Sequence, residues 1–318
     1  MLKTTVIITA YNRKEFIKNA VKSVLENSQR PTEIIVVKNF KDNDIDSFLD
    51  ANDVINMYSD DITLGGKLSQ GISQASGDII FFLEDDDLFS KEKIAEVSQK
   101  FSKYKLGFYH NSQLIFYDEK TIMNTDTQDF LYYDKVNSER KVNYLFHKLK
   151  AGFNVSSIAV SRDLAVKCNS LLKNVKITAD TFLFFCAIEN ELPIMVDLRK
   201  LTYYRILRRK SAYENLNISL FKMQYEDALY FKSIFSKEIL RNLIKIIIEQ
   251  REILYKILSK EVTRKEAIIY TFRMVKDLVY FPSKWNTFLL GLSVLSILSR
   301  ETTRNIFIKK IYSNSIFS

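Results

Sequence analysis

The sequence predicts an α/β fold, in which a mostly parallel sheet is covered by helices and is followed by a helical C-terminal region. Near-continuous apolar runs, typical of strands buried on both faces, recur at 4–11, 32–37 and 78–83. Segments with helical spacing of apolar residues lie between them. After about residue 200 the strand-like runs stop and only long helical patterns remain. This alternation indicates parallel strands joined by helices.

Composition narrows the class of protein. The 318 residues are 47% hydrophobic and 27% charged, which is typical of a globular chain with one large or two medium domains. Two distant cysteines, Cys168 and Cys186, argue against a disulfide scaffold and indicate a reducing compartment. With only two histidines in the chain, any metal must be held by oxygen ligands, which suits Mg²⁺ or Mn²⁺. The N-terminal segment lacks the pattern of a signal peptide and is expected to form a strand.

The first hundred residues are expected to alternate strictly between strands and helices. Gly77 is expected to close the third helix as a C′ glycine. The predicted strands are 4–11, 32–37, 54–58 and 78–83, and the predicted helices are 14–27, 42–50, 67–76 and 90–104.

The rest of the chain divides into a mixed middle and a helical end. Residues 105–118 are expected to form two strands around a turn at His110–Ser112, and residues 119–150 show no clear pattern. Further predictions are strands at 155–161 and 193–198, a helix at 177–190, and helical stretches at 219–259, 263–280 and 284–299, the second of which has a capping box of Thr263 and Glu266.

Charge is distributed unevenly along the chain. Residues 1–198 carry a net charge of −4, whereas residues 199–318 carry +13. We therefore expect two domains, 1–205 and 206–318, of which the second is basic and faces an anionic partner such as a membrane surface.

The segment FFLEDDDLF places four carboxylates, Glu84–Asp87, directly after a predicted buried strand. These four negative charges repel one another. The repulsion can be offset by a divalent cation, by capping of the next helix through Asp87 or Ser90, or by both. In parallel sheets ligands bind beyond the carboxyl ends of the strands, where this acidic segment would lie.

Four stretches resemble the GT-A glycosyltransferases of the inverting family 2: VIITAYNR (6–13), PTEIIVVKN (31–39), GGKLSQGISQASGDIIFFLEDDD (65–87) and, more loosely, ITADTFLFF (177–185). The resemblance covers 4–104 well and 105–200 weakly. It implies transfer of a sugar from a nucleotide-diphosphate-sugar to an acceptor hydroxyl, with inversion and with Mn²⁺ or Mg²⁺ as cofactor.

The same resemblance implies roles for individual residues. Asp86 would bind the metal in the DxD motif, and Asn39 stands where the family places an Asp that reads the base, which leaves the base preference open. Lys67 would lie near the diphosphate or be merely solvated. The residues implied to contact the donor are Thr9, Tyr11, Asn12, Arg13, Asn39, Lys67 and Asp85.

Inversion needs a base for the acceptor hydroxyl, and the resemblance points to Asp180, which lies 94 residues after Asp86. Alternatively, Thr178 or Asp180 is the N-cap of a helix. Glu189 and Glu191 are weaker candidates for the base. Asn154 is either an acceptor contact or part of a polar turn.

The basic end suggests a membrane partner. The apolar segment 285–299, with Trp285 at its edge, is either an interfacial helix or a core helix. The cluster 208–210 either binds a lipid-linked phosphate or is a solvated loop. We expect a cytoplasmic enzyme, peripheral at the inner face of the cell membrane, that builds a lipid-linked or cell-surface glycan and binds no nucleic acid.

Two other functions compete with this one. A sugar nucleotidyltransferase would need a Gly-rich, Arg-containing signature after the first strand, which TAYNR lacks. A non-catalytic, decayed transferase that binds membrane or nucleic acid would explain Glu84 and Asn39, but it would not explain the intact Asp86 and Asp180.

Overall fold

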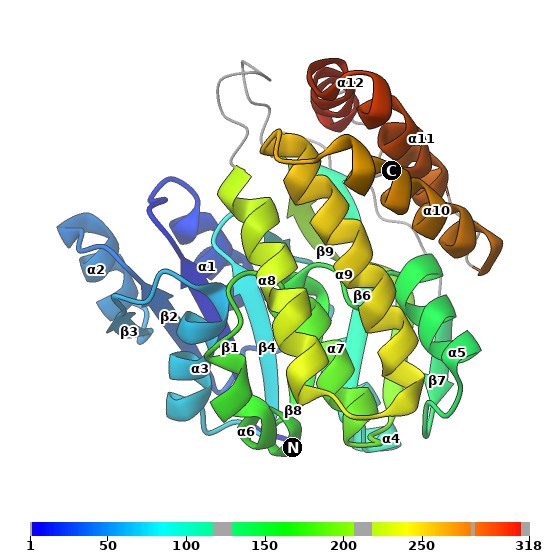
Figure 1. Cartoon of the computed structure of the whole chain (residues 1–318). Helices are drawn as coiled ribbons and strands as arrows, with labels where there is room; N and C mark the ends of the chain where they lie inside the picture. The colour runs from blue at the N-terminus through cyan, green and yellow to red at the C-terminus, as the bar shows by residue number, and fades with distance from the viewer. Residues whose placement is uncertain (1, 117–128, 207–217, 281–283, 313–318) are drawn as a thin grey trace. The chain divides into compact units, whose positions relative to one another are not determined.

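The computed structural model describes residues 2–116, 129–206, 218–280 and 284–312 (Figure 1). The chain forms two compact units, 1–207 and 208–318, which we describe separately. The sequence-based division placed the boundary after residue 205.

The described part of the first unit is built on a nine-stranded sheet in the order β3-β2-β1-β4-β8-β6-β9-β5, with β7 paired to β9. Strands β1 to β4 run parallel to their neighbours within this group, whereas β8 runs antiparallel to β4 and β6. The α/β class is therefore confirmed, with antiparallel pairs in the second half of the sheet. The strands are β1 (Thr4–Ala10), β2 (Glu33–Lys38), β3 (Ile55–Tyr58), β4 (Ile79–Glu84), β5 (Leu88–Phe89), β6 (Phe108–Phe116), β7 (Phe130–Tyr133), β8 (Ile158–Ser161) and β9 (Ile194–Arg205).

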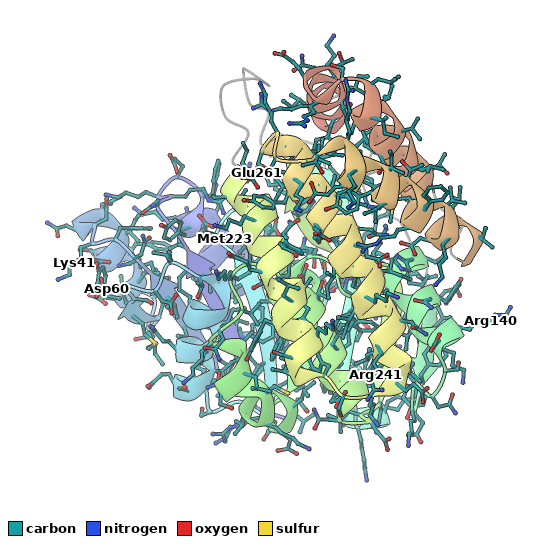
Figure 2. The ribbon with its side chains drawn as sticks, in the orientation of Figure 1. Lys41, Asp60, Arg140, Met223, Arg241 and Glu261 are labelled. Carbon is teal, nitrogen blue, oxygen red and sulfur yellow. The ribbon has the colours of Figure 1, made fainter. Side chains whose placement is uncertain are left out.

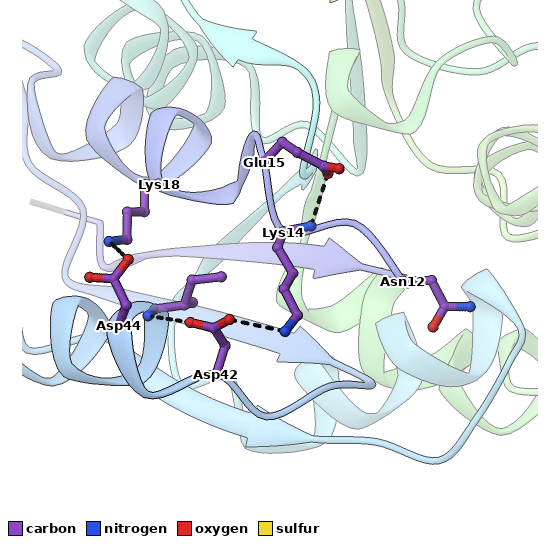
Figure 3. A pocket seen from close by; sticks show the side chains of 7 residues that line it. Asn12, Lys14, Glu15, Lys18, Asp42 and Asp44 are labelled. Carbon is purple, nitrogen blue, oxygen red and sulfur yellow. Dashed lines mark hydrogen bonds and ion pairs between the residues drawn. The ribbon is translucent and has the colours of Figure 1, made fainter.

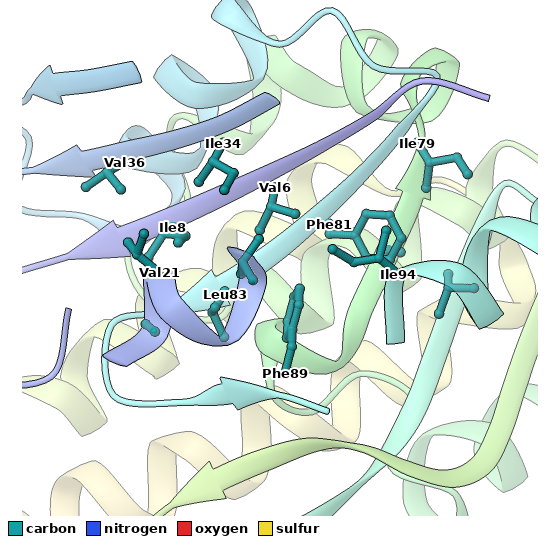
Figure 4. Packing of buried hydrophobic residues seen from close by; sticks show 14 of the residues in the cluster. Val6, Ile8, Val21, Ile34, Val36, Ile79, Phe81, Leu83, Phe89 and Ile94 are labelled. Atoms are coloured by element: carbon teal, nitrogen blue, oxygen red, sulfur yellow. The ribbon is translucent and has the colours of Figure 1, made fainter. Parts of the chain in front are cut away.

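Helices cover the strands because the strands are apolar on both faces. Val6 and Ile8 of β1 pack with Phe81 of β4 in one buried cluster, to which Val21 contributes from the first helix (Figure 4). The helices of this unit are α1 (Ile17–Leu25), α2 (Asn43–Asp50), α3 (Leu64–Gln74), α4 (Lys93–Tyr104), α5 (Glu139–Asn143), α6 (Arg162–Leu172) and α7 (Ala179–Glu189).

Gly77 does not close α3 as a C′ glycine. Helix α3 ends at Gln74 with Ala75 in an extended conformation, and no described glycine has a positive φ. A Cβ on Gly77 would instead lie 2.6 Å from the backbone nitrogen of Thr5. The glycine is therefore explained by the close approach of its backbone to β1.

The two strands expected within 105–118 are one strand, β6. Its register against β9 shifts at Asn111–Gln113, where the sequence suggested a turn. Asn111 is buried there and donates from Nδ2 to Thr202 Oγ1 at 2.9 Å. The polar residues thus mark an irregularity inside the sheet, and β9 continues past the predicted end at 198 to meet it.

The second unit is helical throughout its described residues. The expected stretch 219–259 is two helices, since Lys237 is extended between them. The capping box is confirmed: Thr263 N donates to Glu266 Oε2 at 2.8 Å and Glu266 N donates to Thr263 Oγ1 at 3.2 Å. The helices are α8 (Ile218–Ile234), α9 (Glu238–Leu258), α10 (Arg264–Tyr280), α11 (Lys284–Leu298) and α12 (Arg300–Tyr312); Met223 marks α8 and Arg241 marks α9 in Figure 2.

Helix α11 is a core helix of this unit. Leu289 and Leu292 are buried in a cluster with Leu254 of α9 and Phe307 of α12. This packing decides between the two interpretations of 285–299 in favour of the core helix. Across the described ranges, no helix combines the length and apolar character needed to cross a bilayer. The basic cluster 208–210 lies outside the described residues.

Candidate active site

The carboxyl ends of β1, β2 and β4 bring together the residues that the sequence placed at one crevice. After β1, Asn12 adopts a positive φ of 55°. Its backbone nitrogen donates to Asn39 Oδ1 at 2.8 Å, and Asn39 Nδ2 donates to Asn12 Oδ1 at 2.8 Å. Asn39 is thus fixed to the end of β1, and its oxygen keeps one lone pair for a further donor.

Arg13 holds the acidic segment. Its Nε and Nη2 donate to the two oxygens of Asp85 at 3.0 and 2.5 Å, and its Nη1 donates to Asp86 Oδ2. Although burial opposes it, the charges of Asp85 and Asp86 raise the pKa of Arg13. The guanidinium, which the resemblance implies would contact the donor, thus neutralises two carboxylates in this structure.

Burial of the acidic segment favours its protonated forms. Burial raises the pKa of Asp85 to about 6, against the opposing charge of Arg13. Burial, and then the charge of Asp86, raises the pKa of Asp87 to about 7. Burial also raises the pKa of Glu84, and the other three carboxylates add to the rise. Added positive charge at this segment would therefore be stabilised.

The alternative that Asp87 or Ser90 caps α4 is wrong. Helix α4 follows Glu92, whose side chain makes no cap, and Ile94 N in its first turn donates to Asn27 Oδ1 at 3.0 Å instead. Asp87 instead accepts hydrogen bonds from the backbone nitrogen of Arg205 at 2.9 Å and from Asn154 Nδ2 at 3.3 Å. The carboxylate ties the end of β4 to β9 and to the loop before β8.

Lys67 is buried rather than solvated. Its Nζ donates to the carbonyls of Asp61 and Thr63 at 3.0 and 3.1 Å and lies 4.6 Å from the centroid of the Tyr11 ring. Burial lowers the pKa of Lys67. Tyr11 itself is 42% exposed, so that ring area remains open to a planar ligand. Thr9 is buried and positions the site through its carbonyl, which accepts from Asp85 N at 3.1 Å.

Asp180 lies in the first turn of α7, two residues after the N-cap position, so it is not the N-cap. Its Oδ2 accepts from Asn154 N at 2.9 Å and its Oδ1 from Thr181 N at 2.7 Å. Thr178 occupies the N-cap position but makes no side-chain cap. Both oxygens of Asp180 are therefore oriented by backbone donors.

Asn154 joins Asp180 to the acidic segment. With φ at 63°, it donates from its backbone to Asp180 and from Nδ2 to Asp87, while its Oδ1 accepts from Ser156 N at 2.7 Å. Its side chain is buried and engaged, so the expected contact with an acceptor hydroxyl is not supported.

Two functional neighbours were missed in the sequence. Burial raises the pKa of Tyr204, and the charges of Glu84, Asp87, Asp86 and Asp180 raise it further, so one ring of β9 lies close to all four carboxylates. Lys93 is fully buried and donates to Thr202 Oγ1 at 2.8 Å. Burial lowers the pKa of Lys93 well below its usual value, against the opposing charge of Asp87. The sequence does contain a signal for Lys93, because this lysine lies on the apolar side of the predicted helix 90–104, where a charged residue needs buried partners.

The acidic segment fits a divalent cation through one carboxylate. The described residues contain no group of three or more His, Cys, Asp or Glu side chains arranged to hold a metal ion. Mg²⁺, however, is usually bound by one or two carboxylates together with phosphates and water. Asp86 is 14% exposed and uses only Oδ2 for Arg13, which leaves Oδ1 as an oxygen ligand.

A hollow of about 450 Å³ lies beside Asn12 (Figure 3). Lys14 crosses it to Asp42, with Nζ 3.0 Å from Oδ2, and Asp42 caps α2 by accepting from Ile45 N at 3.1 Å. Of the Asn12–Asn39 pair, Asn12 lines the hollow and Asn39 does not, so the hollow adds no contact to the predicted donor residues beyond Asn12.

Comparison with known proteins gives a family match and distant relatives. A family model described as Glycosyl transferase family 2 matches residues 5–165, just over half of the chain. An uncharacterised glycosyltransferase of Nostoc sp. is 28% identical over 140 residues, which are 40% of this chain and 42% of that protein. The GalNAc(5)-diNAcBac-PP-undecaprenol beta-1,3-glucosyltransferase of Campylobacter jejuni is 28% identical over 122 residues, which are 35% and 37% of the two chains. This chain thus matches about two fifths of the length of these curated relatives.

A solved structure is similar over nearly the whole chain. The crystal structure of S. aureus TarS 1–349 in complex with UDP-GlcNAc matches 97% of this chain and 92% of that chain, with a TM-score of 0.59 and 12% sequence identity. At this identity the likeness shows a shared fold.

Proposed function

The chain belongs to glycosyl transferase family 2, and from this premise we propose that it moves a sugar from a nucleotide-diphosphate-sugar to an acceptor hydroxyl with inversion. The predicted family and GT-A fold are confirmed. The observation that carries the proposal is the link through Asn154, which ties the carboxylate of Asp180 to the acidic segment at the end of β4.

The donor would lie over the carboxyl ends of β1, β2 and β4. Tyr11 offers an exposed ring for a nucleobase, and Asn39 offers both a donor and an acceptor beside it. The titles of two TarS structures name UDP-GlcNAc and UDP as bound ligands, which supports a nucleotide-sugar as the donor class.

Asp86 would hold Mn²⁺ or Mg²⁺ together with the donor diphosphate. When bound, such a cation stabilises the negative charge that develops on the departing diphosphate. Asp85 would stay with Arg13, whose two bonds to it fix the end of β4. Burial raises the pKa of Asp85, and burial followed by the charge of Asp86 raises the pKa of Asp87, so a bound cation would help to keep these carboxylates ionised, which supports a cation there.

Asp180 would act as the general base. The acceptor oxygen forms a bond to the anomeric carbon while the bond from that carbon to the diphosphate oxygen breaks, and Asp180 takes the hydroxyl proton. Because attack comes from the side opposite to the leaving group, the anomeric configuration inverts. Backbone donors from Asn154 and Thr181 orient the carboxylate.

A lipid-linked or cell-surface glycan is the acceptor class that we propose, with the enzyme in the cytoplasm at the inner face of the membrane. The name of the Campylobacter relative describes a sugar chain carried on undecaprenol diphosphate, which supports a lipid-linked acceptor. The net charge of +13 over residues 199–318 supports work beside anionic lipid.

The experiment begins with a panel of nucleotide-sugars, each tested for thermal stabilisation and for release of the nucleoside diphosphate in the presence of Mn²⁺. Asp180→Asn should keep the stabilisation by the best donor but lower turnover by roughly 10²- to 10⁴-fold. Glu189→Gln, on the same helix, is the control and should retain turnover. If no nucleotide-sugar stabilises the wild-type chain, it is a decayed transferase; if Asp180→Asn turns over normally, another group is the base.

A further inference from the structure

Helix α10 exposes an apolar stripe. Ile268, Phe272, Val275 and Val279 are 44%, 73%, 46% and 75% exposed. Their spacing of four, three and four residues places them on one face of the helix. Single exposed apolar residues are ordinary, but a continuous row along a helix marks an interaction surface.

The stripe is not the face that α10 turns into its own unit. That face consists of Ala267, Tyr270 and Met274, which are buried in the cluster with α9, α11 and α12. The unit therefore has a closed core without the stripe, and folding of the helical bundle does not explain these four apolar residues.

Cations flank the stripe, and exposed acids do not. Arg264, Lys265 and Lys276 are exposed on α10. Glu266 is occupied by Lys256 and by the Thr263 cap. Asp277 is buried, and burial raises its pKa to about 6. Within 264–279, the exposed surface is thus apolar along its centre and positive at its margins.

We propose that α10 is a docking surface for anionic lipid, lying in the plane of the membrane interface. The apolar stripe would enter the boundary between headgroups and acyl chains, and the flanking cations would contact lipid phosphates. The surface differs from the segment 285–299 that the sequence suggested, because α11 is packed in the core. The inference deepens the membrane location given under the proposed function, and its test does not depend on the transfer reaction.

Charge disfavours a second copy of the chain as the occupant. In a two-fold contact along the stripe, the cations at the margins of one helix would face the same cations on the other, which is destabilising. An anionic bilayer matches both the centre and the margins of the surface.

The experiment is sedimentation of the full chain with vesicles at low salt, using phosphatidylcholine alone or mixed with phosphatidylglycerol. The wild-type chain should bind the mixed vesicles and bind phosphatidylcholine far less. The double variant Phe272→Asp/Val279→Asp should lower binding to mixed vesicles at least tenfold. Lys265→Glu/Lys276→Glu should remove the preference for anionic lipid.

Leu229→Asp is the matched control, because Leu229 is 42% exposed on α8 and lies outside the stripe. It should bind as the wild type does, and thermal unfolding should show that all variants remain folded. The proposal is overturned if the wild type stays in the supernatant with mixed vesicles or if the double aspartate variant binds normally. It is also overturned if the stripe variants abolish a dimer, measured by light scattering, while vesicle binding is unchanged.

Discussion

At the scale of single residues, Asn154 explains how two carboxylates from distant parts of the chain are held together. Its positive φ turns the backbone nitrogen toward Asp180 while the side chain points to Asp87. Because the residue makes no contact that requires a substrate, we regard it as a positioning residue. Replacements at 154 should therefore affect the chemical step more than donor binding.

Asn154→Gly keeps the positive φ and the backbone donor but removes the side-chain bonds to Asp87 and Ser156. Loss of a hydrogen bond to a charged group is worth about 1.5–3 kcal/mol, so kcat should fall by roughly 10- to 100-fold while the KM for the donor stays unchanged. A raised donor KM with an unchanged kcat would assign Asn154 to substrate binding instead.

Asp87 predicts how stability depends on pH in the presence of a chelator. Its pKa is raised to about 7 in the folded chain, so the folded state binds more protons than the unfolded state between about pH 4 and 7. The free energy of unfolding should therefore fall as pH rises through this window, by an amount on the order of a few kcal/mol. Asp87→Asn should show a smaller drop in Tm between pH 5 and pH 8 than the wild type. An equal drop in both proteins, or a Tm that rises with pH, would refute this role for Asp87.

The residues predicted from sequence are those whose place follows from the strand pattern. Tyr11, Asn39 and Asp86 each follow a buried apolar run, and parallel strands bring such ends together. Tyr204 lies near the same carboxylates only because β9 crosses the sheet beside β5 and β6. That position depends on pairing between distant segments, which no local pattern reveals.

At the scale of the elements, the local sequence pattern predicts whether a segment is a helix or a strand more securely than it predicts where the segment begins and ends or where it is interrupted. The apolar runs of β1, β2 and β4 and the periodicity of α7 lie within a few residues of their predicted ranges. Helix α6 was missed, although Ser161 caps it by accepting from Leu164 N at 3.3 Å. In β6, the polar segment around Asn111 predicts a turn because an Asn is buried inside a sheet only when another strand supplies a partner. That partner, Thr202, lies far along the chain and cannot be read from the local pattern.

Two glycines give opposite predictions for the same substitution. A Cβ on Gly77 would meet the backbone of β1 at 2.6 Å, so Gly77→Ala should destabilise the first unit by about 1–3 kcal/mol. Gly291 lies within α11 with nothing within 4 Å of an added Cβ, so Gly291→Ala should stabilise by roughly 0.5–1 kcal/mol. Urea unfolding of both variants measures the difference. Destabilisation by Gly291→Ala, or tolerance of Gly77→Ala, would contradict this account of the packing.

At the scale of the whole molecule, charge and chemistry are divided between two units. The crevice with the acidic segment belongs to unit 1–207, and the basic excess falls mainly in unit 208–318. Deletion of 281–318 is a poor probe of the basic unit, since Leu289, Leu292 and Phe307 contribute to its core. Point substitutions on α10 leave that core intact and therefore separate membrane binding from folding.

The central claim is that the crevice binds a nucleoside diphosphate through a cation on Asp86. Calorimetric titration of UDP in the presence and absence of Mn²⁺ measures this directly for the full chain, for Asp86→Ala and for Asp44→Ala. Asp44 is an exposed carboxylate on α2 paired with Lys18, which makes it a matched control. We expect Mn²⁺ to tighten UDP binding in the wild type and in Asp44→Ala, and this gain to be lost in Asp86→Ala. Binding that ignores Mn²⁺ in the wild type, or a full Mn²⁺-dependent gain in Asp86→Ala, would contradict the claim.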